Sequence, residues 1–271
     1  HHGWRGCLRR KQEARRSAAQ GKGRVPVLIG NDTLTRATVP IASVHELAKV
    51  YSKPGSAVHV HALRGIDVEF VEGESVAICG QSGSGKSTLM NLLGCLDRPT
   101  SGSYLLGGVN VAELDDDELS EIRGQRIGFV FQNFNLIPQL TILENLEVPL
   151  FYQGVSPQRR EQRSRELASM VGLEDRAHHR PNELSGGQQQ RAAIARALIN
   201  DPLIILADEP TGNLDTATGQ MILEIFNQLH RDGKTILMVT HEPDVAACCQ
   251  RIITLRDGRI VSDQRPTVEI G

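Results

Sequence analysis

The most specific signal in this 271-residue chain is the stretch Gly80-Gln81-Ser82-Gly83-Ser84-Gly85-Lys86-Ser87-Thr88. It matches the phosphate-binding pattern G-x-x-x-x-G-K-[ST] and lies between an apolar run, residues 76–79, and a helix-like stretch, residues 89–93. The glycines let backbone N–H groups turn toward phosphate oxygens, while the helix start and the Lys86 ammonium add positive charge. A plain Gly/Ser-rich turn does not explain Lys-Ser-Thr in this register.

The pattern therefore predicts a nucleoside triphosphate site. The Ser87 hydroxyl is expected to bind Mg²⁺. The residues predicted to contact the nucleotide here are Gly80, Ser82, Gly83, Ser84, Gly85, Lys86, Ser87 and Thr88.

Other motifs follow in a fixed order. Gln132 follows Phe131 at the end of an apolar run, and Leu184-Ser185-Gly186-Gly187-Gln188 comes next. A second apolar run, residues 203–207, leads into Asp208-Glu209 and then into Asn213-Leu214-Asp215. His241 follows a third apolar run, residues 235–240. Each of these short motifs often occurs by chance in unrelated sequences. As an ordered set, from about residue 44 to 260, they resemble the ATP-binding cassette (ABC) family.

The resemblance implies an α/β fold with a RecA-like P-loop NTPase core, an antiparallel β subdomain and an inserted α-helical subdomain. The expected ATPase domain spans residues 44–264, with the helical insert at about residues 133–200. Residues 1–43 are expected to form a basic, disordered extension and residues 265–271 a short tail.

The same resemblance implies roles for the motif residues. Lys86 and the loop amides would hold the phosphates of ATP, and Asp208 would support Mg²⁺ beside Ser87. Glu209 would act as general base on water, His241 would contact the γ-phosphate, and Gln132 would sense Mg²⁺ and the attacking water. Tyr51 lies where family members stack an aromatic ring on adenine, although packing on the edge of the core is the alternative.

Two copies of the chain are expected to share each active site. In the family, the motif of Ser185, Gly186, Gly187 and Gln188 closes over the ATP of a partner chain, and Asp215 lies at the same seam. The resemblance therefore implies an ATP-dependent homodimer whose opening and closing is the mechanical output.

The composition of the chain indicates where in the cell the protein is expected to work. No apolar run approaches the roughly 18 residues of a membrane span, so the chain is expected to work with a separate membrane permease, at the cytoplasmic face of the inner membrane. Five cysteines without metal-ligand spacing predict reduced thiols and no zinc site. Residues 1–31 contain eight Lys or Arg and one acid, Glu13, which favours a solvated tail or attraction to anionic lipid.

Several local patterns have ordinary explanations. Asp115-Asp116-Asp117 precedes a helix-like run and fits a helix start better than a metal site. Arginines 159, 160, 163 and 165 alternate with acids, which indicates a solvated helix face and no nucleic-acid partner. Residues 216–231 predict a helix that buries its apolar residues, Met221, Ile222, Ile225, Phe226 and Leu229.

The stretches 93–102, 140–145 and 207–215 are similar to those of the ABC subgroup of macrolide-exporter, lipoprotein-releasing and cell-division ATPases. The alternative is an ABC-type ATPase with a non-transport role in cell division or nucleic-acid maintenance. The long coiled coil or zinc modules of such nucleic-acid enzymes do not fit the short interval between Gln132 and Ser185. The cargo cannot be read from this chain.

Overall fold

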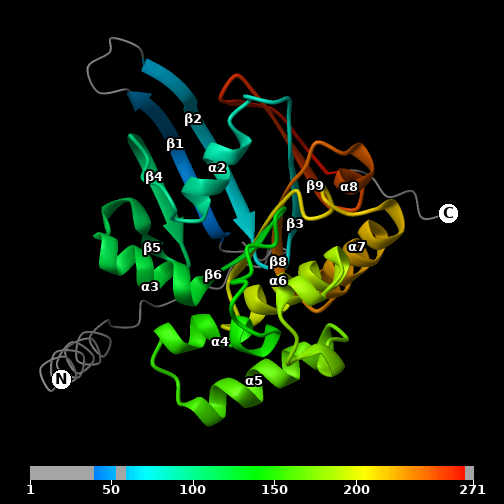
Figure 1. Ribbon diagram of the computed structural model, residues 1–271. Helices are drawn as coiled ribbons and strands as arrows, with labels where there is room; N and C mark the ends of the chain where they lie inside the picture. The colour runs from blue at the N-terminus through cyan, green and yellow to red at the C-terminus, as the bar shows by residue number, and fades with distance from the viewer. Residues whose placement is uncertain (1–39, 53–58, 266–271) are drawn as a thin grey trace, which may run out of the picture. The chain divides into compact units, whose positions relative to one another are not determined.

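The computed structural model describes residues 40–52 and 59–265, which form two β-sheets and a set of helices (Figure 1). The first strand begins at Pro40, four residues before the expected start, so residues 40–43 belong to the sheet; the rest of the predicted basic extension lies outside the described residues. The strands are β1 (Pro40–Ser52), β2 (His59–Val71), β3 (Ser75–Cys79), β4 (Ser101–Leu106), β5 (Val109–Asn110), β6 (Ile127–Phe131), β7 (Ile204–Asp208), β8 (Thr235–Val239), β9 (Arg251–Arg256) and β10 (Arg259–Gln264).

The larger sheet has the order β10-β9-β3-β8-β7-β6, and it is parallel except for the antiparallel edge hairpin of β9 and β10. Its central strands are buried on both faces, as their unbroken apolar runs predict. Successive side chains enter opposite cores: Ile205 and Ala207 face one, and Ile204 and Leu206 face the other. The sheet therefore separates two hydrophobic cores.

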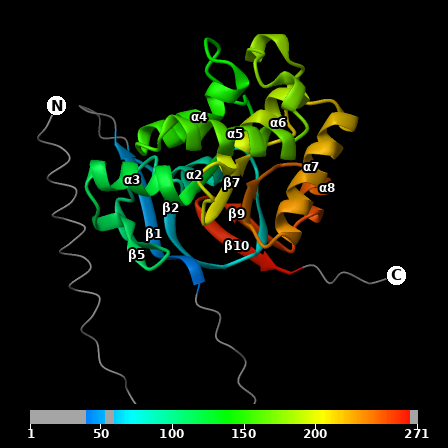
Figure 2. The same cartoon turned by 90° about the horizontal axis from the view of Figure 1, so that it is seen from below.

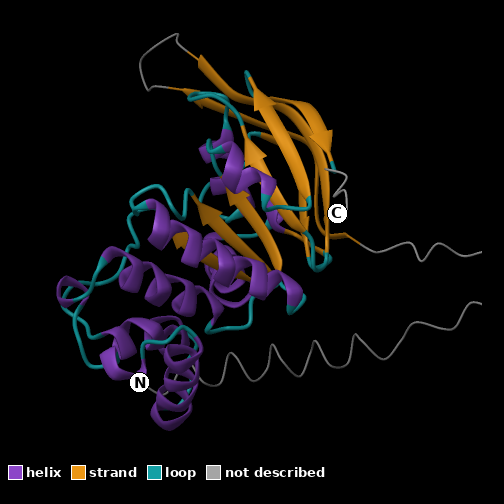
Figure 3. Cartoon of the chain, turned by 90° about the vertical axis from the view of Figure 1, so that its right-hand side faces the viewer, coloured by secondary structure: helices purple, strands orange, loops and turns teal. Residues whose placement is uncertain are grey.

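The smaller sheet is antiparallel, with the order β2-β1-β4-β5. Together with helix α2 (Lys86–Leu93), which contacts β2, β7 and β8, it encloses the core that contains Ile204 and Leu206. Figure 3 shows the long strands, in orange, toward the top and most of the helices, in purple, below them. Strand β2 is continuous through Gly65, although glycine is uncommon inside a strand. The strand runs through because Gly65, at φ +77°, lies within a register shift that leaves pairing intact on both sides.

The remaining helices cover the other face of the larger sheet or its edge. They are α3 (Asp116–Arg126), α4 (Ile142–Tyr152), α5 (Pro157–Met170), α6 (Gly186–Leu198), α7 (Thr216–Arg231) and α8 (Pro243–Ala247), with 3₁₀ turns at Val111–Glu113, Glu174–Arg176 and Pro181–Glu183. Helices α4, α5 and α6 pack on one another as the predicted helical insert (Figure 2). Helix α6 also contacts β6.

Helix starts follow the sequence closely. Asp115 caps α3 and Thr141 caps α4, each in a reciprocal bond with a glutamate three residues on, so the Asp115 cluster has the helix-start role expected of it. Helix α7 has the predicted bounds, but Met221 is 61% exposed and its predicted burial is wrong. Leu223 is buried in its place, because the face turned to the core is set by the packing of α7 against β8 and α6.

Candidate functional site

The phosphate-binding loop joins β3 to α2, and its glycines are required by close contacts. A side chain at Gly80 would come within 2.3 Å of the Leu255 carbonyl oxygen, and one at Gly85 within 2.7 Å of the Ala62 carbonyl oxygen. Gly85 also caps α2 with φ +104°, a conformation that other residues rarely adopt. The loop is therefore fixed between β9 and β2, with the amides of the α2 start free to bind an anion.

Lys86, the first residue of α2, is buried and folds back over the loop. Its Nζ donates hydrogen bonds to the carbonyl oxygens of Gly80 (2.8 Å) and Gln81 (2.9 Å). The hydroxyl of Ser84 is buried without a hydrogen-bond partner among the described residues. The loop thus keeps a cation and a spare polar group at the point where phosphate is predicted to bind.

A pocket of about 600 Å³ opens in front of this loop. Asp208 and Glu209 enter it from the end of β7, and His241 follows the end of β8, because parallel strands bring their carboxyl ends to one edge of the sheet. The predicted site residues that line it are Gly80, Ser82, Gly83, Gly85, Lys86, Ser87, Thr88, Asp208, Glu209 and His241.

Glu209 is held in an unusual conformation. Its φ is +44°, in the left-handed region, and its N–H donates to the Val239 carbonyl oxygen (2.9 Å). Its carboxylate Oε1 lies 2.8 Å from His241 Nδ1; because a carboxylate only accepts, the Nδ1–H of His241 donates, which leaves Nε2 as an acceptor in the neutral ring. The sheet therefore places a carboxylate and an imidazole in one pocket.

Asp208 carries the clearest electrostatic perturbation in the pocket. Partial burial raises the pKa of its carboxyl, the charge of Glu209 raises it further, and Lys86 acts in the opposite direction. A hydroxyl at Ser87 and carboxylates at Asp208 and Glu209 are the oxygen donors that Mg²⁺ prefers, and a cation would relieve the repulsion between the two acids. The residues present fit the metal.

We expect Asp208→Asn to stabilise the nucleotide-free protein while it impairs ATP hydrolysis. A raised pKa means that the Asp208 contribution to stability is present below about pH 4, its unfolded value, and is lost as pH rises through the folded value. The amide removes this cost, so Tm at pH 7 should rise. The gain should shrink toward pH 4.

Differential scanning fluorimetry from pH 4 to pH 8, without nucleotide or metal, measures this effect. Asp175→Asn, at an exposed carboxylate, is the matched control and should leave Tm unchanged at every pH. A lower Tm for Asp208→Asn at pH 7 would contradict the electrostatic argument.

Ser84, Tyr51 and Gln132 are also predicted site residues, but they do not line the pocket. Tyr51 is the second-last residue of β1 and is 41% exposed; its hydroxyl donates to Asp97 Oδ2 (2.8 Å), and Lys49 Nζ lies 4.9 Å from its ring centroid. Gln132 follows β6, and its side chain contacts the loop after β7. Beyond the phosphate loop and the strand ends, the wall is formed by Val60, His61 and Ala62 of β2. The sequence analysis missed these three, and no motif marks them.

The Ser185 motif forms a separate, exposed helix start. The Ser185 hydroxyl accepts from the Gln188 N–H (3.3 Å), and the Gln188 side chain accepts from the Ser185 N–H (2.9 Å). Gly187 lies where a side chain would meet Thr218 at 2.3 Å, so α6 packs closely on α7. Asp215 caps α7 through Thr218, which lowers the pKa of its carboxyl. None of these residues lines the pocket in front of Lys86.

Comparison with known proteins identifies this arrangement. Residues 63–212 match the family described as "ABC transporter", and this span includes the phosphate loop, Gln132, the Ser185 motif, Asp208 and Glu209. The chain belongs to the ABC transporter family. It is an ATP-binding and ATP-hydrolysing subunit, and nothing found supports the alternative non-transport role.

The relatives of this ABC protein agree. It is 56% identical to an uncharacterized ABC transporter ATP-binding protein of Thermotoga maritima, over 79% of this chain and 92% of that protein. It is 52% identical to the macrolide export ATP-binding/permease protein MacB of Rhodopseudomonas palustris (strain BisB18), over 78% of this chain but 32% of that protein.

A solved ATP-binding cassette, a dimer in a post-hydrolysis state bound to ADP and Pi, superposes with a TM-score of 0.76 at 47% identity, covering 83% of this chain and 98% of that one. The expected RecA-like core with antiparallel and helical subdomains is thereby confirmed. In the described part of this ABC subunit, no helix combines the length and apolarity that crossing a bilayer requires.

Proposed function

We propose that this subunit hydrolyses Mg·ATP at a site shared by two copies of the chain and that the resulting motion drives a membrane permease. The observation that carries the proposal is the separation of two anion-binding structures: the Lys86 loop inside its pocket and the exposed start of α6 outside it. A site built by two chains would use both.

Five residues of the pocket have separate roles in this proposal. Ser87 and Asp208 would hold Mg²⁺, which supplies neutralisation of phosphate charge when bound. Gln132, whose side chain lies outside the pocket in this structure, would sense the ion and the attacking water. Lys86 would exchange its bonds to Gly80 and Gln81 for phosphate oxygens. Glu209 would accept a proton from the attacking water, and His241, which holds the Glu209 carboxylate in the free protein, would turn to the γ-phosphate.

The closing residues would come from the partner chain. Ser185, Gly186, Gly187 and Gln188 offer a hydroxyl and helix-start amides, and Asp215 lies at the start of α7 against which α6 packs. Tyr51 remains the residue proposed for adenine, which requires its hydroxyl to leave Asp97 or the base to approach its exposed face. The solved dimeric relative, which is bound to ADP and Pi, supports this arrangement.

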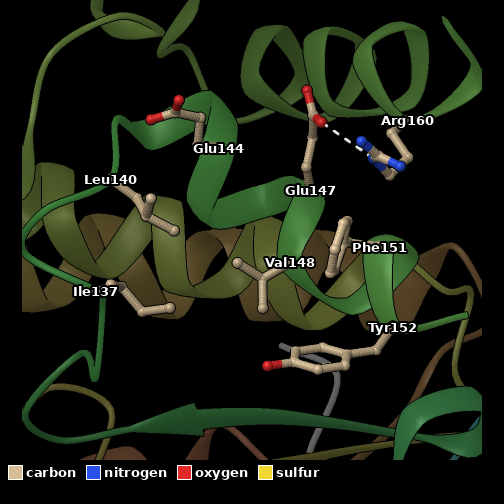
Figure 4. A pocket seen from close by; sticks show the side chains of 8 residues that line it. All are labelled: Ile137, Leu140, Glu144, Glu147, Val148, Phe151, Tyr152 and Arg160. Atoms are coloured by element: carbon tan, nitrogen blue, oxygen red, sulfur yellow. Dashed lines mark hydrogen bonds and ion pairs between the residues drawn. The ribbon is translucent and has the colours of Figure 1, made fainter. Parts of the chain in front are cut away.

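A second surface suits the permease. A groove of about 280 Å³ runs along α4 and is lined by Ile137, Leu140, Glu144, Glu147, Val148, Phe151, Tyr152 and Arg160 (Figure 4). Phe151 and Tyr152 are 62% and 83% exposed, which is unusual for aromatic side chains. Arg160 contacts both Glu147 (3.2 Å) and the Phe151 ring, so one wall of the groove is already ordered.

We propose that a cytoplasmic segment of an export permease docks in this groove and places the subunit at the inner face of the membrane. The macrolide export relatives carry "ATP-binding/permease" in one name, and this chain spans about a third of their length, so in them a cassette and a permease belong to one protein. Such a partner would have an apolar tip for Phe151 and Tyr152.

Site-specific photocrosslinking tests the docking surface. A photoreactive phenylalanine analogue at Tyr152, in cells that make the protein, should give crosslinks to an integral membrane protein. The same group at Val261, which is 57% exposed on β10, is the control and should not. Equal crosslinking at both positions, or capture of water-soluble proteins alone at Tyr152, would refute docking in the groove.

A further inference from the structure

The side chain of Gln132 lies outside the nucleotide pocket. It packs against a second loop, the one between Glu209 and α7. Its Nε2 donates to Asn213 Oδ1 (3.3 Å), and a side chain placed on Gly212 would come within 2.7 Å of the same Nε2. The amide of Gln132 therefore rests directly on the backbone of Gly212. In this position it does not contribute to the lining of the pocket in front of Lys86.

Asn213 also holds the backbone that carries Gln132. Its Nδ2 donates to the Gln132 carbonyl oxygen (3.1 Å) and to Asn133 Oδ1 (2.8 Å), while its Oδ1 accepts from the Gln132 side chain. Only an amide offers both donors and an acceptor on so short a side chain. Asn213, which is exposed, thus holds both the backbone and the side chain of Gln132.

The loop that follows β6 begins with Gln132, and its later residues are anchored independently of Asn213. The half-buried Arg196, on α6, donates from its guanidinium to the carbonyl oxygens of Phe134 (3.0 Å) and Asn135 (2.5 Å). Both of these residues have left-handed backbones, with φ of +61° and +49°, a conformation that needs such support. Arg196 therefore ties the loop to the helix that begins at Ser185, and the Asn213 contacts are the ones free to open.

We infer that Asn213 is a positioning residue for ATP hydrolysis: it latches Gln132 outside the pocket, and Gln132 reaches the metal and water only when this latch opens. The inference rests on the proposed role of Gln132 and adds what controls it. Asn213 lies two residues before Asp215, so a partner chain that presses on this seam would act on the latch directly. Hydrolysis would then be coupled to dimer closure.

The latch itself can be tested in the full chain without nucleotide. With glutamine side chains labelled by ¹⁵N, the Gln132 amide signal, assigned by its loss in Gln132→Ala, should shift in Asn213→Ala and its protons should exchange faster with solvent. Asn227→Ala, the same truncation on α7, is the control and should leave the signal in place. An unchanged Gln132 signal in Asn213→Ala overturns the latch.

The consequence for catalysis is a change in metal requirement. If the competent conformation is a minor one, freeing it raises apparent affinity in proportion to its population. Asn213→Ala should therefore lower the Mg²⁺ concentration for half-maximal ATPase activity by about three- to tenfold. The same substitution in a Gln132→Ala background should have no effect, because nothing remains to be released. A shift that persists there assigns the effect to another residue and overturns the inference.

The two proposals fail in different ways. A Gln132→Ala protein with the metal requirement of the unmodified chain would remove Gln132 from the metal role, which is part of the proposed function. The latch is judged by the amide signal of the nucleotide-free protein, which involves no metal at all.

Discussion

Replacing Glu209 by Gln should stop ATP turnover while leaving ATP binding intact. The amide has the shape of the carboxylate but cannot accept a proton, and loss of a general base costs about 10²- to 10⁴-fold in rate. Because hydrolysis would separate the two chains, the variant should accumulate as a dimer with Mg·ATP. Single-turnover assays and size-exclusion chromatography with ATP measure the two effects.

The matched control is Glu242→Gln, which removes a nearby carboxylate that accepts from Thr211 and does not line the nucleotide pocket. It should hydrolyse ATP close to the unmodified rate and return to monomer after turnover. Hydrolysis by Glu209→Gln at the rate of this control would remove Glu209 from the role of base.

Mixing two inactive variants should restore ATPase activity. Lys86→Ala removes the ammonium that is held over the phosphate loop, and Ser185→Arg places a bulky cation at the start of α6, where the serine caps the helix. Each homodimer should lose at least about 100-fold in rate, since each lacks one half of every site. A mixed dimer pairs the intact loop of one chain with the intact Ser185 of the other and regains one complete site.

Recovered activity should depend on total protein concentration, as expected for association of two chains. Glu183→Arg is the matched control, because it places the same cation on the exposed 3₁₀ turn before the motif, and its own homodimer should remain active. Strong activity in unmixed Ser185→Arg protein would refute the shared site.

Much of the fold could be predicted from sequence because its signals are local. The apolar runs that form β3, β7 and β8 end in the motif residues, so the parallel sheet and its active edge follow from the same stretches. The helix start expected at the Asp115 cluster is present, because the capping partner of Asp115, Glu118, is only three residues away. The conformation of the phosphate loop can be predicted from the positions of its glycines, where side chains would clash with neighbouring backbone.

The missed features depend on partners far away in the chain. Gln132 follows β6 as the apolar run predicts, but the orientation of its side chain is set by Asn213, 81 residues later. The pocket wall from β2, including His61, exists because that strand passes Gly85, which no local pattern reveals. Met221 fits a helical apolar stripe equally well whether exposed or buried.

The bonds from Lys86 to the Gly80 and Gln81 carbonyls have a consequence for repeated cycling. When products depart, the ammonium has two oxygen partners within reach, so its charge stays compensated and the vacated loop keeps its shape. A nucleotide that arrives next meets a rigid receptor and has only to compete with two carbonyl oxygens. A site that empties and refills many times can thus remain folded between one turnover and the next.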